Sequence, residues 1–376
     1  MIRTYKYKLY QTKRTKHINN IINISANIYN HCIALHKRYY KLYGKHLNKF
    51  QLQKHITKLK KMEKYSFWKK VPSQAIQAIT ERIDNGYKKF FDYLKLRKKG
   101  LKPRRVSPPT FKAVKKYKSY TLKGKVGYKL EDNIISLNGY KYKFWLSRPI
   151  DGKIKTVTVK RDNIGDFYIC ITLEKDEPKI NVATGKSVGI DFGMKTFLTL
   201  SDETEVKAPL YHLKSLKKIK KLNRNLSKKQ KGSNARKKAR IRLAKLHKKV
   251  ANQRRDYFQK LTNLLASKYD NIFIEDLNIS AMTKIWGRKI SDLAFSEFVT
   301  ILSYKTNITK IDRYYPSSKT CSNCGYILKE LDLKTREWVC PSCNAKHQRD
   351  INASINIHRV GASTLSIGTV RPAIVG

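Results

Sequence analysis

The chain has 376 residues, of which 82 are Lys or Arg and 27 are Asp or Glu, so its formal net charge at pH 7 is +55. This charge favours a polyanionic partner, because basic side chains placed on phosphates release condensed counterions. A hydrophobic fraction of 40% excludes a wholly disordered chain, and the length suggests two or three domains. An acidic membrane surface would be a rival partner, but no apolar run is long enough to span a bilayer and the N-terminus has no secretion-type apolar segment, so we expect a cytoplasmic protein.

The N-terminal half is predicted to combine strands with a basic helical bundle. Residues 1–10 alternate apolar and basic side chains, which is typical of an edge strand. Residues 15–94 contain only one proline, Pro72, and repeat apolar residues at spacings of three and four, which predicts a bundle of helices. Prolines at residues 103–109 end that stretch, and β-branched and aromatic residues then predict strands. These strands are residues 140–145, 155–160 and 167–173.

The C-terminal half is predicted to contain a sheet covered by helices. After a linker at 177–186, residues 187–200 form a predicted hairpin of two strands. Residues 213–265 are rich in Lys, Arg and Leu at near-heptad spacing, which predicts two long helices broken near Gly232. An isolated basic coiled coil has the same spacing, but a predicted strand at 271–275 directly afterwards favours packing against a sheet.

Four of the six cysteines form two Cys-x-x-Cys pairs separated by fifteen residues, which is the ligand spacing of a zinc ribbon. They are Cys321, Cys324, Cys340 and Cys343. Each pair is followed by Gly325 or Asn344, residue types that tolerate a positive φ. Disulfides are disfavoured without a secretion signal, and a redox site needs only one pair. We therefore predict one structural Zn²⁺, with His347 not a ligand and with Cys32 and Cys170 as core residues.

Three carboxylates occupy positions suited to metal-ion chemistry. Asp191 and Glu275 each follow a short apolar run, and Asp350 lies in a dense polar segment. Taken singly, each resembles an ordinary solvated acid. The comparable acids are Asp202, Asp276 and Asp312. Taken together, three acids on neighbouring elements could hold two Mg²⁺ ions roughly 4 Å apart, an arrangement that hydrolyses phosphodiesters.

These residues resemble the TnpB family of transposon-encoded proteins, which are relatives of the type V CRISPR effector nucleases. The motifs that carry the resemblance are residues 188–193 (VGIDFG), 274–278 (IEDLN), 312–325, 336–341 and 349–353 (RDINA). The resemblance implies an α+β multidomain fold: an RNase H-like (RuvC) α/β nuclease domain with a zinc-ribbon insertion, plus an N-terminal β-barrel interrupted by a helical bundle.

The resemblance also implies domain boundaries. These are a wedge-like barrel at 1–10 and 104–178, a recognition bundle at 11–103, a nuclease domain at 185–314 and 348–358, a zinc ribbon that binds the target nucleic acid at 315–347, and a flexible tail at 359–376. Residues 351–357 alternate as a strand would, yet the family places a helix there, and we follow the family. Gln348 stands where many relatives have an acid, so we do not expect it to be an indispensable ligand. The connection at 304–312 looks shorter than is usual in the family.

The resemblance implies an RNA-guided, magnesium-dependent DNA endonuclease. Asp191, Glu275 and Asp350 match the three RuvC acids and would bind the two catalytic Mg²⁺ ions, while the four cysteines match the zinc site. A guide RNA would pair with one strand of a double-stranded DNA target beside a short flanking motif. The alternatives are an RNA-guided DNA-binding repressor, expected to lack at least one acid, and a guide-free nuclease or transposase. We expect a prokaryotic protein that associates with the nucleoid when bound to DNA, either monomeric or dimeric on one RNA.

Overall fold

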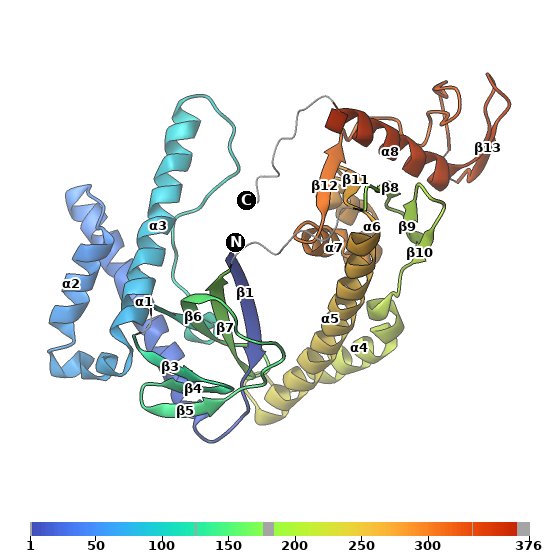
Figure 1. Ribbon diagram of the computed structural model, residues 1–376. Coiled ribbons are helices and arrows are strands. Elements are labelled where there is room, and N and C mark those ends of the chain that lie inside the picture. Colours follow the sequence, from blue (N-terminus) through green and yellow to red (C-terminus); the bar gives the residue numbers. More distant parts are fainter. Residues whose placement is uncertain (1, 125, 176–183, 333, 367–376) are drawn as a thin grey trace. The chain divides into compact units, whose positions relative to one another are not determined.

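The structure is a computed structural model that describes residues 2–124, 126–175, 184–332 and 334–366. The chain divides into two compact units, Met1–Lys179 and Ile180–Gly376, each with its own hydrophobic core. Figure 1 labels most of the helices and strands of both. Across the described ranges, no helix combines the length and the apolar character needed to cross a membrane.

The described strands of the first unit form two antiparallel sheets (Figure 1). One sheet has the order β1 (Ile2–Lys8), β7 (Phe167–Glu174), β6 (Lys153–Arg161) and β2 (Ser119–Lys123). The other has the order β3 (Tyr128–Glu131), β4 (Ile134–Leu137) and β5 (Tyr140–Lys143). β1 is an edge strand, as predicted, and a bridge between Leu9 and Phe144 links the ends of β1 and β5. The predicted strands are confirmed, while a closed barrel stays a prediction.

The helices predicted between β1 and β2 are also confirmed. They are α1 (Thr15–Tyr43), α2 (Lys49–Leu59), the 3₁₀ helix η1 (Glu63–Lys70) and α3 (Ser73–Lys98), followed by the short 3₁₀ helix η2 (Val114–Lys116). Local signals set their ends. α1 stops at Gly44, which has a φ of 64°, and α2 starts with a capping box between Asn48 and Gln51.

A chain of polar side chains links helices of this bundle, and two of its members, His36 and Asp84, are buried. The Nε2 atom of His36 lies 2.6 Å from Nδ1 of His46, and Nε2 of His46 lies 3.1 Å from a carboxylate oxygen of Asp84. The Lys88 ammonium is 3.0 Å from the other oxygen of Asp84, and the His36 ring stacks on Tyr87 with 3.8 Å between centroids. Burial, and then the charge of His46, lower the pKa of His36 from 6.5 to about 4.

This histidine chain predicts that the first unit loses stability in mild acid. The unfolded chain takes up a proton at His36 near pH 6.5, whereas the folded chain does so only near pH 4. The contribution of His36 to the free energy of unfolding is therefore fully present above pH 6.5. It is lost as the pH falls toward 4, and the loss is on the order of 3 kcal/mol. We expect urea unfolding at pH 7 and pH 4.5 to show this loss, and His36→Gln to reduce it. An equal loss in both proteins would contradict the assignment.

In the second unit, the described strands form a mixed sheet with the order β10 (Glu205–Lys207), β9 (Thr196–Leu200), β8 (Ser187–Asp191), β11 (Asn271–Glu275) and β12 (Asn307–Ile311). β10, β9 and β8 pair antiparallel, which confirms the predicted hairpin, whereas β8, β11 and β12 pair parallel. The central residues of β8 and β11 are buried, whereas the edge strand β12 is buried only at Ile311. Parallel pairing brings the carboxyl ends of β8 and β11 to the same edge of the sheet.

The helices of this unit are α4 (Tyr211–Ser227), α5 (Asn234–Lys268), α6 (Ile279–Leu293), α7 (Phe295–Leu302) and α8 (Arg349–Ser366). The predicted break between the two long helices is confirmed, and the Ser233 side chain caps α5 by accepting the Arg236 N–H. Two short strands, β13 (Glu337–Val339) and β14 (Lys346–Gln348), pair between β12 and α8.

Helix α8 corrects the predicted flexible tail at 359–376. The helix continues through Ser366, and residues 367–376 lie outside the described residues. Close packing explains the continuation, because a Cβ atom on Gly361 would lie 2.2 Å from the Phe273 ring of β11. Likewise, a Cβ on Gly189 of β8 would lie 2.2 Å from the carbonyl oxygen of Ser354. Two glycines thus allow α8 to lie directly on the sheet, and the helix that the family resemblance implied for 351–357 is confirmed.

The two cysteines outside the paired motifs differ in burial. Cys32 is fully buried in the bundle, as predicted. Cys170 is only half-buried, which corrects its assignment to the core. The alternation of β7 explains the difference, because Ile169 and Ile171 take the buried face and leave Cys170 on the other one.

Candidate functional site

The fold brings the three predicted acids to one edge of the mixed sheet. Asp191 is the last residue of β8 and Glu275 is the last residue of β11, and the residues before them are paired in parallel register. Asp350 lies in the first turn of α8, which packs against both strands. All three side chains are partly buried. Rigid elements of the second unit therefore position each acid.

The negative charges of Glu275 and Asp350 act on Asp191. Burial raises the pKa of Asp191 from 3.8 to about 7, and the negative charges of Glu275 and Asp350 contribute to the rise. Burial also raises the pKa of Glu275, against the effect of a hydrogen bond from Ser317. Carboxylates that resist ionisation beside one another are stabilised when a divalent cation neutralises them, so this donor set fits a hard metal ion.

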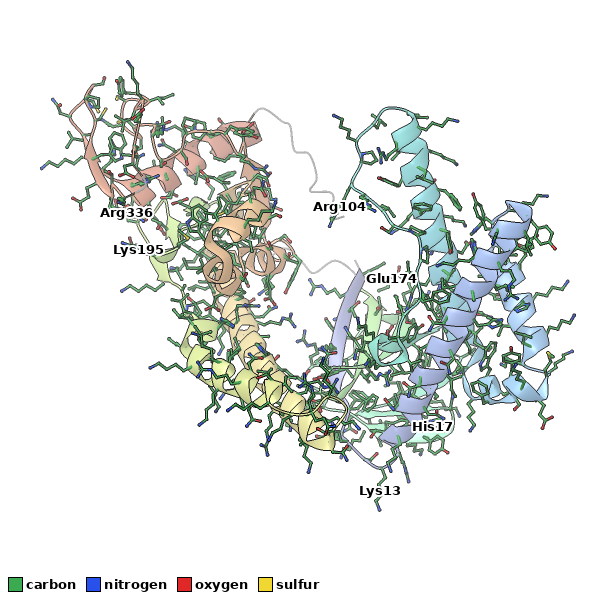
Figure 2. All side chains as sticks on the ribbon, turned by 180° about the vertical axis from the view of Figure 1, so that it is seen from behind. Lys13, His17, Arg104, Glu174, Lys195 and Arg336 are labelled. Atoms are coloured by element: carbon green, nitrogen blue, oxygen red, sulfur yellow. The ribbon has the colours of Figure 1, made fainter. Side chains whose placement is uncertain are left out.

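Two residues of the segment 315–347, here called the cysteine-rich segment, contact the acids. The hydroxyl of Ser317 donates a hydrogen bond to Glu275. The guanidinium of Arg336, labelled in Figure 2, donates from Nη1 to both carboxylate oxygens of Asp350, at 3.0 and 3.1 Å. In the described part of the chain, the four cysteines form a group of side chains that could hold a metal ion, and the three acids do not form such a group. The sequence motifs included Ser317 and Arg336 but gave no signal of these roles.

The comparable acids have other partners. Asp202 accepts a hydrogen bond from the Tyr269 hydroxyl, and Asp276 forms ion pairs with Lys310 and Arg313. Asp312 accepts the backbone N–H of Tyr314. Gln348, which we did not expect to be an indispensable ligand, accepts the Ile351 N–H at 2.6 Å at the start of α8. These contacts explain the positions of the four side chains, and none of the contacts requires a bound metal.

The four paired cysteines meet as the sequence predicted. Their sulfurs all lie within 4.8 Å of one another, with 3.6 Å between Cys321 and Cys343 and 3.6 Å between Cys324 and Cys340. A tetrahedral Zn²⁺ with Zn–S bonds of 2.3 Å separates its sulfurs by about 3.8 Å, so the site fits this ion. Gly325 and Asn344 have φ angles of 81° and 57°, as expected after such turns.

The surroundings of the cysteines suit thiolate ligands. A hydrogen bond from the Ala345 backbone lowers the pKa of the Cys343 thiol to about 6, whereas burial raises the pKa of Cys321 to about 11. Coordination by a metal would deprotonate both. The Nε2 of His347 lies 3.0 Å from the Cys321 sulfur, and the His347 ring packs on Trp338.

Buried asparagines of α8 hold the cysteine-rich segment against the site. The side-chain amides of Asn352 and Asn356 both donate to the carbonyls of Ser317 and Thr320, and Asn352 also accepts the Ser322 N–H. Both asparagines are almost fully buried, so these bonds are shielded from water. Sequence reasoning missed both residues, because a polar residue on a helix gives no sign of which neighbour it faces.

Helices α4 and α5 form a strongly basic surface in the same unit. α4 carries six Lys or Arg residues and no acid, and α5 carries twelve and a single acid, Asp256. Figure 2 shows nitrogen-tipped side chains along both helices. Most of these side chains are exposed, and such a surface attracts a phosphate backbone through counterion release.

Comparison with known proteins relates most of the chain to one group. Residues 168–286 match the family model OrfB_IS605, described as a probable transposase, and residues 295–357 match the Cas12f1-like TNB domain. A Streptomyces pristinaespiralis protein, provisionally named an RNA-guided DNA endonuclease, is 30% identical over 98% of this chain and 92% of its own length. An Escherichia coli K12 protein, provisionally named RNA-guided DNA endonuclease InsQ, is 27% identical over 91% of this chain and 87% of its own.

Two solved structures share the α+β fold. The structure titled Cas12f1-sgRNA-target DNA complex aligns with 92% of this chain and 83% of its own, with a TM-score of 0.55 and 15% sequence identity. The structure of the mini-RNA-guided endonuclease CRISPR-Cas_phi3 aligns with 96% of this chain and 92% of its own, with a TM-score of 0.50 and 10% identity.

Proposed function

This chain belongs to the TnpB family of RNA-guided DNA endonucleases, and on that premise we propose that it cleaves DNA at Asp191, Glu275 and Asp350 under the direction of a bound RNA. The observation that carries the proposal is the meeting of these acids at one edge of the sheet, where burial, and then the negative charges of Glu275 and Asp350, raise the pKa of Asp191. The strand order, with three antiparallel strands continued by two parallel ones, supports an RNase H-like (RuvC) nuclease fold.

The chemistry of the site follows from its carboxylates. Asp191, Glu275 and Asp350 would hold the catalytic metal ions, and a bound pair of Mg²⁺ ions supplies an activated water and neutralises charge on the leaving oxygen. The strands β8 and β11 fix two of the acids on a rigid sheet. Ser317 orients the carboxylate of Glu275, and Arg336 orients that of Asp350. Each acid is thus held in place before substrate arrives, which lowers the cost of organising the site.

We assign the remaining parts by the same resemblance. The segment 315–347 would be a zinc ribbon, held by one structural Zn²⁺ on the four cysteines, that binds the target nucleic acid. Residues 11–103 and the surrounding strands of the first unit would bind the guide RNA and the flanking DNA motif. The nuclease domain would comprise residues 185–314 and 348–366, which extends its last helix beyond the boundary that the sequence suggested.

Arg336 provides a direct test of how the ribbon supports the nuclease. We expect Arg336→Ala to lower the cleavage rate on the order of 10²-fold, because Asp350 loses two charge-assisted hydrogen bonds. Arg336→Lys should recover part of the rate. Binding of target DNA should change little, because the described partner of the Arg336 guanidinium is the Asp350 carboxylate. A cleavage rate for Arg336→Ala equal to that of wild type would refute the role.

The presence of all three acids favours a nuclease over a guided repressor, and a guide-free nuclease would not need the basic first unit. The experiment that tests the proposal starts by purifying the protein from cells that carry its native flanking DNA and sequencing any RNA that copurifies. The complex is then incubated with Mg²⁺ and a target library with randomised flanks. Cleavage beside one short motif is the expected result. A discrete RNA without cleavage would indicate the repressor, and cleavage without a discrete RNA would indicate the guide-free enzyme.

A further inference from the structure

A cavity of about 310 Å³ lies among α4, α5 and α6, within the basic surface described above. We call it the histidine cleft, because His212 of α4 and His247 of α5 line it. Arg254 and Val250 of α5 and Asp292 of α6 are further lining residues. Its volume is at the small end of the range for ligand sites in proteins, so it suits a group the size of one base and its sugar. None of these residues belongs to the acid cluster or to the zinc site.

The two histidine rings are spaced to accept a planar group. Their planes are within 20° of parallel, and their centroids are 6.5 Å apart. That separation is slightly less than two contact distances of ~3.5 Å, so a flat ring would enter between them after a small outward movement of the exposed His247 ring. His247 is exposed at the rim, and Val250 forms a buried apolar floor.

The polar side chains of the cleft favour a base over a phosphate. Asp292 is 8% exposed, and its two oxygens accept the backbone N–H groups of His212 and Leu213 at 3.1 and 3.0 Å, which fixes the start of α4. A carboxylate has about four acceptor positions, so two remain for the N–H donors of a base, while its charge repels phosphate. Arg254 donates to the Ser291 carbonyl at 3.4 Å and presents a flat guanidinium.

We propose that the histidine cleft holds one unstacked nucleobase between His212 and His247, while the surrounding lysines and arginines bind the adjoining phosphates. The proposal rests on the proposed nucleic-acid function. The base can come from RNA or from a DNA single strand, since both offer the same aromatic face.

The test measures how much a base contributes to the affinity for an oligonucleotide whose number of phosphates is held constant. The full-length protein carrying Asp191→Asn, in buffer without Mg²⁺, is titrated with single-stranded 12-mers of RNA and of DNA, each intact or with abasic central positions. Affinity is compared among the parent protein, His212→Ala/His247→Ala, His212→Phe/His247→Phe and the matched control Asn252→Ala, an exposed residue of α5 outside the cleft. Thermal unfolding checks that each variant is folded. Diethylpyrocarbonate labelling with mass spectrometry then reports whether the oligonucleotide protects both histidines.

We expect the alanine pair to lose on the order of tenfold in its preference for intact over abasic oligonucleotides, and the phenylalanine pair and Asn252→Ala to keep it. Intact oligonucleotides, and not abasic ones, should protect both histidines, and whichever of RNA or DNA gives the larger effect identifies the source of the base. An unchanged preference in the alanine pair, or labelling that no oligonucleotide reduces, would overturn the cleft. Failure of the parent protein to bind either nucleic acid would overturn the proposed function itself.

Discussion

Asp191→Asn is expected to abolish DNA cleavage while leaving the binding of guide RNA and target DNA within about twofold of wild type. The substitution removes one negative charge from the most strongly coupled acid of the cluster, whose pKa burial and two neighbouring carboxylates raise to about 7. The cleavage rate should fall on the order of 10³-fold or more. The site loses a ligand of the metal ions whose positive charge stabilises the transition state. Single-turnover cleavage in Mg²⁺, with binding measured without Mg²⁺, separates the two effects.

The matched control for that experiment is Asp256→Asn on α5. Asp256 is exposed and pairs with Lys260 one turn away, far from any role in the acid cluster. An exposed pair of this kind contributes little to stability, so cleavage and binding should both stay at the wild-type level. A parallel fall of binding and cleavage in Asp191→Asn would mean that the acid supports the fold or the nucleic-acid interface, and would remove it from the catalytic assignment.

Cys321→Ser is expected to release the zinc and to inactivate the nuclease. Structural Zn²⁺ contributes an apparent ~10–16 kcal/mol in small zinc-binding peptides, far more than this short segment gains from its few buried apolar residues. Without the ion, the segment that carries Ser317 and Arg336 should unfold, and Glu275 and Asp350 should lose those contacts. Zinc content measured by mass spectrometry should fall from one ion per chain to none, and the cleavage rate should fall with it.

Cys170→Ser is the matched control for the loss of a thiol. It removes a half-buried sulfur from the first unit and touches none of the four ligands. Zinc content and cleavage should both be unchanged. A Cys321→Ser protein that retains a full zinc ion, or that loses zinc but cleaves at the wild-type rate, would contradict the coupling between the ribbon and the acids.

Local patterns in the sequence predicted the elements of this fold well, because each depends on neighbouring residues. The apolar run before Asp191, the break near Gly232 and the two Cys-x-x-Cys turns are all signals of this kind. The α8 helix was different, since 351–357 alternate as a strand would and only the family resemblance indicated a helix. Its extension to Ser366 depends on Gly361 meeting Phe273, a contact between residues far apart in the sequence.

The candidate site was predictable in its ligands and not in their supports. Asp191, Glu275 and Asp350 could be chosen because acids beside apolar runs and in family motifs stand out. The partners Ser317 and Arg336 could not, because hydroxyl and guanidinium groups are frequent in a chain with this many basic residues, and only the fold decides which acid each one faces. The histidine cleft was likewise invisible, since His212 and His247 lie on two helices whose packing brings them together.

The bonds that join the ribbon to the acids also act in the opposite direction. Suppose that a folded ribbon favours one arrangement of Glu275 and Asp350. Thermodynamic reciprocity then requires that a metal ion or substrate bound at those acids changes the affinity of the ribbon for zinc by the same factor. A zinc ion bound to the four cysteines would then respond to the state of the acids as well as support them. Zinc would be lost most readily when no substrate holds the acids in place, so the same enzyme should need more free zinc at rest than during cleavage.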